Sequence, residues 1–158
     1  MNNLNLSRSL ADVQSGVILA SVEIAAPVER VFAALTRPEQ ITRWWGKEGI
    51  YKTESWLSDF RVGGNWKADG RNADGTTFSV SGTYLEIDPP KKIVQTWKSG
   101  WDGDNETRLT YRLEQVDRGT KVTLRHEGFV GRPGSCEDHA KGWELVLNWL
   151  ARFLAPAS

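Results

Sequence analysis

The sequence predicts an α+β fold in which a curved antiparallel sheet of about six or seven strands wraps around one long C-terminal helix, with two short helices after the first strand. Residues 51–129 form strand-like runs separated by turn residues, and residues 135–154 carry apolar side chains at helical spacing. Such a sheet is open on one side. We expect the short helices and the loops 100–105 and 128–135 to line its mouth.

We expect the first strand over residues 17–25, because these residues are rich in β-branched side chains and stop before Pro27. Pro27 suits the first position of a helix, and the stretch PVERVFAALT spaces its apolar residues three and four apart. A second short helix over residues 38–45 presents Trp44 and Trp45. The two helices are short and closely joined.

Residues 51–129 indicate an antiparallel meander, because Gly-Gly, Asp-Gly and Asp-Pro-Pro turns interrupt them. The alternation is clearest in the last two strands. There Leu109 and Tyr111 share one face, and Leu124 and His126 share the inner face of the next strand. We therefore expect the imidazole of His126 to point into the interior.

Residues 135–154 predict one long amphipathic helix lying on the sheet. His139 and Trp143 share its apolar arc, so His139 should also face the sheet. Gly142 interrupts the same arc, where glycine costs about 1 kcal/mol relative to alanine. We expect this glycine to allow the close approach of a neighbouring backbone or aromatic ring.

The composition excludes several classes of function. The chain has 158 residues with formal net charge +0, so no overall field attracts nucleic acid or an anionic membrane. One cysteine permits no internal disulfide, and the sequence contains neither a secretory signal nor the roughly 18 apolar residues of a membrane span. We expect a cytoplasmic protein with no nucleic-acid or membrane partner, a loose arm over residues 1–15 and a single domain over residues 16–158.

The unusual feature is the number of tryptophans, which is eight. Rigid aromatic faces provide large apolar contact areas at small entropic cost, so several rings around one space would favour ligand binding. The facing of Trp66 and Trp97 stays open, because Ile93 and Val94 are both apolar and a bulge could shift the register. The candidate ligand-binding residues are Trp44, Trp45, Trp66, Phe78, Trp97, His126, His139 and Trp143.

Other chemistries have weaker support. The two histidines could act as acid and base or orient a ligand carbonyl, or they could be neutral core residues. Cys136 has neither an oxyanion hole nor an orienting third residue, and the sequence lacks the ligand spacings of a zinc site, so we expect no cofactor and no metal. Glu86 has the parity of Phe78, and it faces the interior unless the strand kinks or ends there.

Six segments together resemble the START-like helix-grip superfamily. Within it the chain is similar to single-domain proteins like the C-terminal domain of the heat-shock-protein-90 ATPase activator. The resemblance implies an internal cavity that commonly holds a small apolar ligand. It does not imply one chemistry, because relatives include lipid carriers, polyketide cyclases and co-chaperone domains. The matching segments are residues 24–46, 59–66, 82–97, 107–114, 119–129 and 139–154.

The leading hypothesis is the binding of a small apolar or aromatic ligand between the sheet and the C-terminal helix, with His126 or His139 giving a polar contact. One alternative is a cyclase- or hydrolase-type enzyme that uses these histidines as acid and base. Another is a chaperone-interaction module. The sequence leaves open a chaperone or homodimer partner, for which Trp101 is a candidate contact residue if it does not line the mouth.

Overall fold

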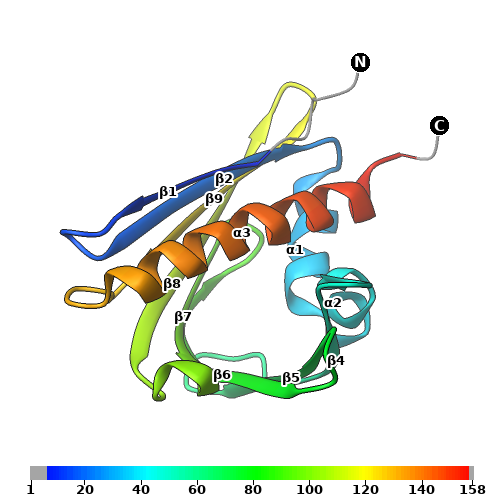
Figure 1. The fold of residues 1–158 in the computed structure, drawn as a ribbon. Helices are drawn as coiled ribbons and strands as arrows, with labels where there is room; N and C mark the ends of the chain where they lie inside the picture. The colour runs from blue at the N-terminus through cyan, green and yellow to red at the C-terminus, as the bar shows by residue number, and fades with distance from the viewer. Residues whose placement is uncertain (1–6, 157–158) are drawn as a thin grey trace.

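The computed structural model describes residues 7–156, and over this range the chain forms one antiparallel sheet that curves around a long helix (Figure 1). The nine strands stand in the order β1-β2-β9-β8-β7-β6-β5-β4-β3. The strands are β1 (Arg8–Asp12), β2 (Val17–Ile24), β3 (Gly46–Lys47), β4 (Tyr51–Ser58), β5 (Asn65–Asn72), β6 (Thr77–Asp88), β7 (Lys92–Ser99), β8 (Glu106–Val116) and β9 (Gly119–Glu127). The helices are α1 (Val28–Thr36), α2 (Pro38–Trp44), the short 3-10 helix η1 (Gly100–Asp102) and α3 (Pro133–Leu154).

The first strand, β1, corrects the expected loose arm where the structure describes it. Arg8–Asp12 pairs antiparallel with β2, and the Ser9 hydroxyl donates to the backbone oxygen of Ala140 on α3 at 2.6 Å. Residues 1–6 of the expected arm lie outside the described residues. Backbone pairing and polar contacts, more than apolar side chains, hold this edge strand, so its polar sequence shows no strand pattern.

The sheet has more strands than the six or seven expected. Besides β1, the two-residue strand β3 is too short to produce any alternation. The short helices lie where the sequence predicts them, and the Trp44 indole on α2 donates to the backbone oxygen of Ala34 on α1 at 2.9 Å. This bond ties the two helices together.

The inward faces of β8 and β9 confirm the alternation read from the sequence. Leu109 lies opposite His126, and Tyr111 lies opposite Leu124, with all four side chains buried. The outward positions between them are polar or charged and are partly or fully exposed. The sheet therefore has one apolar concave face and one polar convex face.

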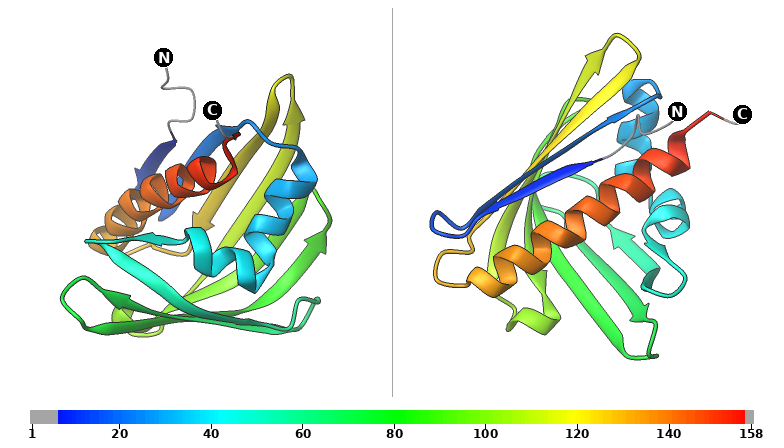
Figure 2. Two further views of the ribbon diagram at one scale, coloured as in Figure 1. Left: turned by 90° about the vertical axis from the view of Figure 1, so that its right-hand side faces the viewer. Right: turned by 45° about the horizontal axis from the view of Figure 1, so that its top comes forward.

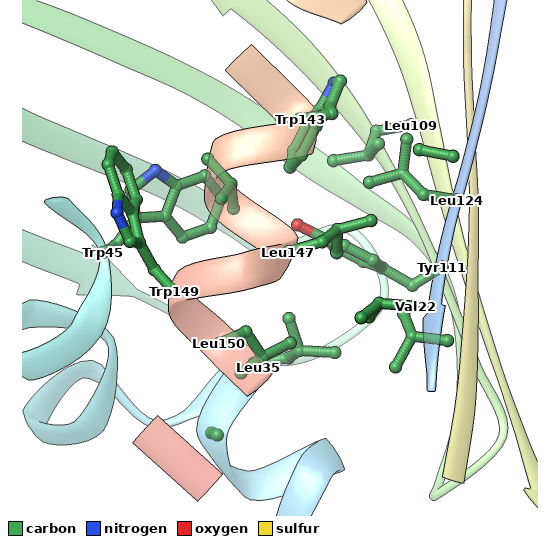
Figure 3. Packing of buried hydrophobic residues seen from close by; sticks show 14 of the residues in the cluster. Val22, Leu35, Trp45, Leu109, Tyr111, Leu124, Trp143, Leu147, Trp149 and Leu150 are labelled. Carbon is green, nitrogen blue, oxygen red and sulfur yellow. The ribbon is translucent and has the colours of Figure 1, made fainter. Parts of the chain in front are cut away.

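Helix α3 crosses the concave face of the sheet, as the two views of Figure 2 show. Leu147 lies beside Tyr111 and Leu150 lies beside Leu35, so the C-terminal half of α3 is packed against both sheet and α1 (Figure 3). Trp45 lies on the opposite side of the helix from Tyr111. Among residues 7–156, no helix is both long and apolar enough to cross a membrane.

A register shift in β6 decides the position of Glu86. The shift lies between Tyr84 and Glu86, so the buried Tyr84 is followed two residues later by an exposed side chain. The Glu86 carboxylate pairs with the Lys92 ammonium at 2.6 Å. Glu86 therefore lies outside the cavity and is not a buried general base.

Gly82 on β6 provides a test of how tightly the sheet packs beneath the aromatic rings. A Cβ at this position would lie 2.0 Å from the backbone oxygen of Thr96 and 2.7 Å from Nε1 of Trp66. We expect Gly82→Ala to lower the free energy of unfolding by about 2–3 kcal/mol, measured by urea denaturation, because neither neighbour can move freely. Gly134→Ala, whose Cβ meets no atom, is the matched control. Equal midpoints for the two variants would contradict this packing.

Candidate functional site

A cavity of about 550 Å³ lies between the N-terminal half of α3 and strands β4 to β7. Six of the eight tryptophans line it, and its wall is mostly apolar. The lining residues are Trp45, Tyr51, Thr53, Trp56, Trp66, Ala68, Asn72, Thr76, Thr77, Phe78, Val80, Trp97, Trp101, Asp138, His139, Gly142, Trp143 and Val146.

The indole rings support one another as a continuous wall. Trp45 is at the centre, with ring centroids 5.7 Å from Trp56, 5.8 Å from Trp143 and 6.3 Å from Trp97. Trp56 stacks on Trp66 at 4.9 Å with only 9° between the planes. Mutual contacts of this kind hold the rings in place, so much of the cavity surface is fixed before any ligand enters.

The structure brings six of the eight predicted ligand-binding residues to the cavity. They are Trp45, Trp66, Phe78, Trp97, His139 and Trp143. Trp66 and Trp97, whose facing the sequence left open, are both buried on the concave side. Trp44 and His126 do not line the cavity. Trp44, the last residue of α2, bonds to the backbone of α1 and stacks on Trp45 at 5.1 Å, whereas Trp45 follows the helix in an extended conformation and lines the cavity.

His126 is completely buried behind the wall, and hydrogen bonds connect it directly to Trp143 and, through Thr107, to the backbone of Trp97. The Trp143 indole donates to Nδ1 of His126 at 3.0 Å, which leaves the proton of the imidazole on Nε2. Nε2 then donates to the Thr107 hydroxyl at 2.7 Å, and that hydroxyl donates to the backbone oxygen of Trp97 at 2.9 Å. Burial lowers the pKa of His126 well below its usual value, with the nearby His139 adding to the effect. Its role is structural.

The ring of His139 lines the cavity, but both of its nitrogens bond to protein atoms. Nδ1 donates to the backbone oxygen of Ser135 at 2.9 Å, and Nε2 accepts from the Ser99 hydroxyl at 3.1 Å. The Ser99 hydroxyl in turn accepts from the Trp97 indole at 2.9 Å. Burial lowers the pKa of His139, so the ring is neutral at pH 7. Neither histidine keeps a nitrogen for a ligand, which corrects the expected polar contact.

Sequence reasoning missed the cavity residues of β4, which are Tyr51, Thr53 and Trp56. A register shift between Thr53 and Ser55 places Thr53 and Trp56 on the same face although they are three residues apart. Simple alternation assigns these two residues to opposite faces. The sequence offered one signal for these residues: Tyr51 and Thr53 are two residues apart, which places them on the same face of a strand.

The mouth of the cavity is formed partly by Trp101, which is 58% exposed. Its ring stacks on His139 at 6.0 Å and meets the edge of Phe78 at 5.8 Å. The Asp102 carboxylate accepts from the Arg132 guanidinium and from the Ser135 hydroxyl, which fixes η1 against the start of α3. Trp101 is thus a mouth residue.

Gly142 also differs from expectation. A Cβ built there meets no atom within 4 Å, so no backbone or ring approaches it closely. Gly142 lies on the cavity side of α3 and leaves space there. The apolar arc of the helix is interrupted where the cavity begins.

The described residues offer little to nucleophilic or metal chemistry. Cys136 is buried, and this burial, with Glu137 nearby, raises the pKa of its thiol, so it stays protonated. Over residues 7–156 no group of three or more His, Cys, Asp or Glu side chains is placed to hold a metal ion. The cavity wall presents mainly apolar surface.

Comparison with known proteins finds one family and many similar structures. Residues 25–155 match the family described as "Activator of Hsp90 ATPase homolog 1-like protein". A Chromobacterium violaceum protein is 28% identical, with 90% of this chain and 99% of that chain covered and a TM-score of 0.79. An AHSA1-like protein from Aeromonas hydrophila is 20% identical, with coverages of 87% and 90% and a TM-score of 0.73.

A third similar structure is CalU16 from Micromonospora echinospora, at 24% identity, coverages of 95% and 87% and a TM-score of 0.71. No curated protein matches the chain. The two structures below 25% identity establish the shared fold alone.

The buried neutral histidines predict a loss of stability at acidic pH. Because both folded-state pKa values are lowered, the unfolded chain binds more protons below about pH 6.5. The free energy of unfolding should be unaffected by these groups above that pH. It should fall by up to about 1.4 kcal/mol per pH unit for each histidine below it, until each folded-state pKa is reached.

Urea denaturation between pH 7.5 and 5.5 would measure this dependence. His139→Gln keeps one donor and one acceptor and should reduce the slope by about half. Imidazole NMR signals that titrate near pH 6.5 in the folded protein would contradict the buried neutral state.

Proposed function

The chain belongs to the family of Activator of Hsp90 ATPase homolog 1-like proteins and has the START-like helix-grip fold, and from this premise we propose that it binds a small apolar or aromatic molecule in its tryptophan-lined cavity. The ligand would lie between α3 and strands β4 to β7. Trp45, Trp66, Trp97 and Trp143 would contact it with their ring faces. Phe78 and the ring of His139 would bound it toward the mouth.

The cavity itself carries this proposal. Its volume of about 550 Å³ falls in the range of small-molecule sites, which is roughly 300–1,000 Å³. The C-terminal half of α3 is packed in contrast, as the positions of Leu147 and Leu150 illustrate. A ligand that covers the exposed indole faces would remove apolar surface from water, at roughly 25 cal/mol for each Å².

The hydrogen bonds of the two histidines favour binding over acid–base catalysis. A general acid or base needs a nitrogen within hydrogen-bonding reach of the reacting group. All four imidazole nitrogens of His126 and His139 already bond to protein atoms. Interaction with a chaperone, the other alternative drawn from the sequence, stays a prediction that a pull-down would address.

A ligand panel tests the proposal directly. We would titrate the protein with naphthalene, biphenyl, indole, decanol and oleate, and follow tryptophan emission and the midpoint of thermal unfolding. Since six indoles line the cavity, an occupant should change the emission, and binding to the folded state should raise the midpoint. Absence of both responses for every compound would overturn the proposal.

Gly142→Leu should block the cavity without unfolding the protein. Its side chain would enter space that the structure leaves free, and the helix gains about 1 kcal/mol from losing a glycine. We expect panel compounds to bind roughly ten- to hundredfold more weakly, because steric overlap costs about 1–3 kcal/mol.

The matched control for this variant is Gly134→Leu, on the exposed first turn of α3, where an added Cβ also meets no atom. It should bind like the wild type. Equal weakening in both variants, measured by fluorescence titration, would place the ligand elsewhere.

A further inference from the structure

Four side chains with hydroxyl groups line the cavity: Thr76 and Thr77 are exposed, whereas Tyr51 and Thr53 on β4 are more deeply buried. Tyr51 and Thr53 are two residues apart on the strand, so their side chains lie on the same face. Aromatic rings surround them: the Tyr51 ring lies 5.3 Å from Phe78, which also lines the cavity, and 5.4 Å from Trp149, which does not. Tyr51 and Thr53 are therefore the less exposed hydroxyl groups of the wall, next to its aromatic rings.

The Tyr51 hydroxyl has a proton to donate. Its oxygen accepts from the Trp45 indole at 3.1 Å, and among residues 7–156 it donates to no acceptor. Burial raises the pKa of Tyr51 to about 12, so the phenol stays protonated at neutral pH. With one acceptor position already used by Trp45, the available function of this oxygen is donation.

Thr53 presents a second hydroxyl. The side chain is only 7% exposed, and its backbone N–H is already used by the backbone oxygen of Trp45 at 3.1 Å. Within the described part of the chain, Oγ1 of Thr53 has no hydrogen-bond partner. The unpaired side-chain atoms that are fully enclosed are Nε1 of Trp56 and Nε1 of Trp66, so Oγ1 of Thr53 keeps some accessible surface. Thr53 Oγ1 thus opens on the cavity that the residue lines. A ligand in the cavity could therefore reach this hydroxyl, which has a proton to donate.

The charges around the cavity restrict that partner. Among residues 7–156, no lysine or arginine lines the wall, and the acidic side chain that does, Asp138, is exposed. A carboxylate or phosphate would lose its hydration without gaining a cation. An ammonium group could meet the indole faces, but it only donates hydrogen bonds and would leave the donor hydroxyl of Tyr51 without an acceptor. A neutral group with an acceptor oxygen therefore fits the interior best.

We propose that the ligand is a neutral ring compound with one oxygen acceptor, such as a ketone, and that Tyr51 and Thr53 donate hydrogen bonds to this oxygen. This inference rests on the proposed function, because it describes the occupant of the same cavity. The indole faces take the rings, and the two hydroxyls of β4 fix their orientation. The histidines take no part in this recognition.

Four probes with the same ring system separate the contribution of the rings from that of the polar or charged group. They are 1-tetralone, tetralin, 1,2,3,4-tetrahydro-1-naphthoate and 1-aminotetralin, which carry a ketone, no polar group, an anion and a cation. Calorimetric titration should show that the ketone binds best and that the two charged compounds bind worst. Tighter binding of either ion than of 1-tetralone would overturn the neutral ligand class.

Two substitutions test the hydroxyls. Tyr51→Phe and Thr53→Val should each weaken the binding of 1-tetralone roughly three- to tenfold, which corresponds to one neutral hydrogen bond, and should leave tetralin unaffected. Thr53→Val keeps the bond between Trp45 and Tyr51, so it remains informative if Tyr51→Phe folds poorly. Tyr84→Phe is the control, because its hydroxyl bonds to Ser58 at 2.9 Å and does not line the cavity.

A spectroscopic measurement distinguishes donation from simple packing. The carbonyl carbon of ¹³C-labelled 1-tetralone should shift downfield on binding to the wild type, and this shift should shrink in both variants but not in Tyr84→Phe. If 1-tetralone and tetralin bind equally to all four proteins, the proposed hydrogen bonds are wrong while the cavity proposal stands. If no probe binds the wild type and the ligand panel also fails, the proposed function itself is wrong.

Discussion

One chain of hydrogen bonds connects the long helix to the centre of the sheet. It runs from the Trp143 indole through His126 and the Thr107 hydroxyl to the backbone of Trp97, and so joins α3 to β9, β8 and β7. In this series of hydrogen bonds Nδ1 of His126 accepts and Nε2 donates. The imidazole must therefore be neutral and protonated on Nε2. These bonds fix the indole of Trp143 and the backbone of Trp97, two residues of the cavity wall. A buried histidine that does not line the cavity thus supports its wall.

Helix α3 has different surroundings in its two halves. The C-terminal half packs Leu147 and Leu150 against the sheet and α1, while the N-terminal half faces the cavity with Gly142 and Trp143. The packed half supplies burial that stabilises the fold, and it holds the other half at a distance from β4 to β7. Rings that stack on each other then keep the cavity open, because no single indole can turn inward without leaving its neighbours.

Polar groups in this fold are divided between support and recognition. Ser99 and Ser135 use the nitrogens of His139, and Asp102 holds η1 against α3, so these groups maintain the mouth. The hydroxyls of Tyr51 and Thr53 keep capacity that no described residue uses. Membership of the family establishes a shared architecture, but the chemistry of the cavity depends on which polar side chains are left unpaired.

Periodicity in the sequence by itself determined the class of fold, the two short helices, the C-terminal helix and the inward direction of His126, because each depends on spacing within one element. Only the tertiary structure decided what lies opposite each residue. Bulges in β4 and β6 moved Trp56 into the cavity wall and Glu86 out to solvent, and neighbours of His126 and His139 took every imidazole nitrogen. Spacing fixes a face, whereas register and partners depend on contacts between residues far apart in the chain.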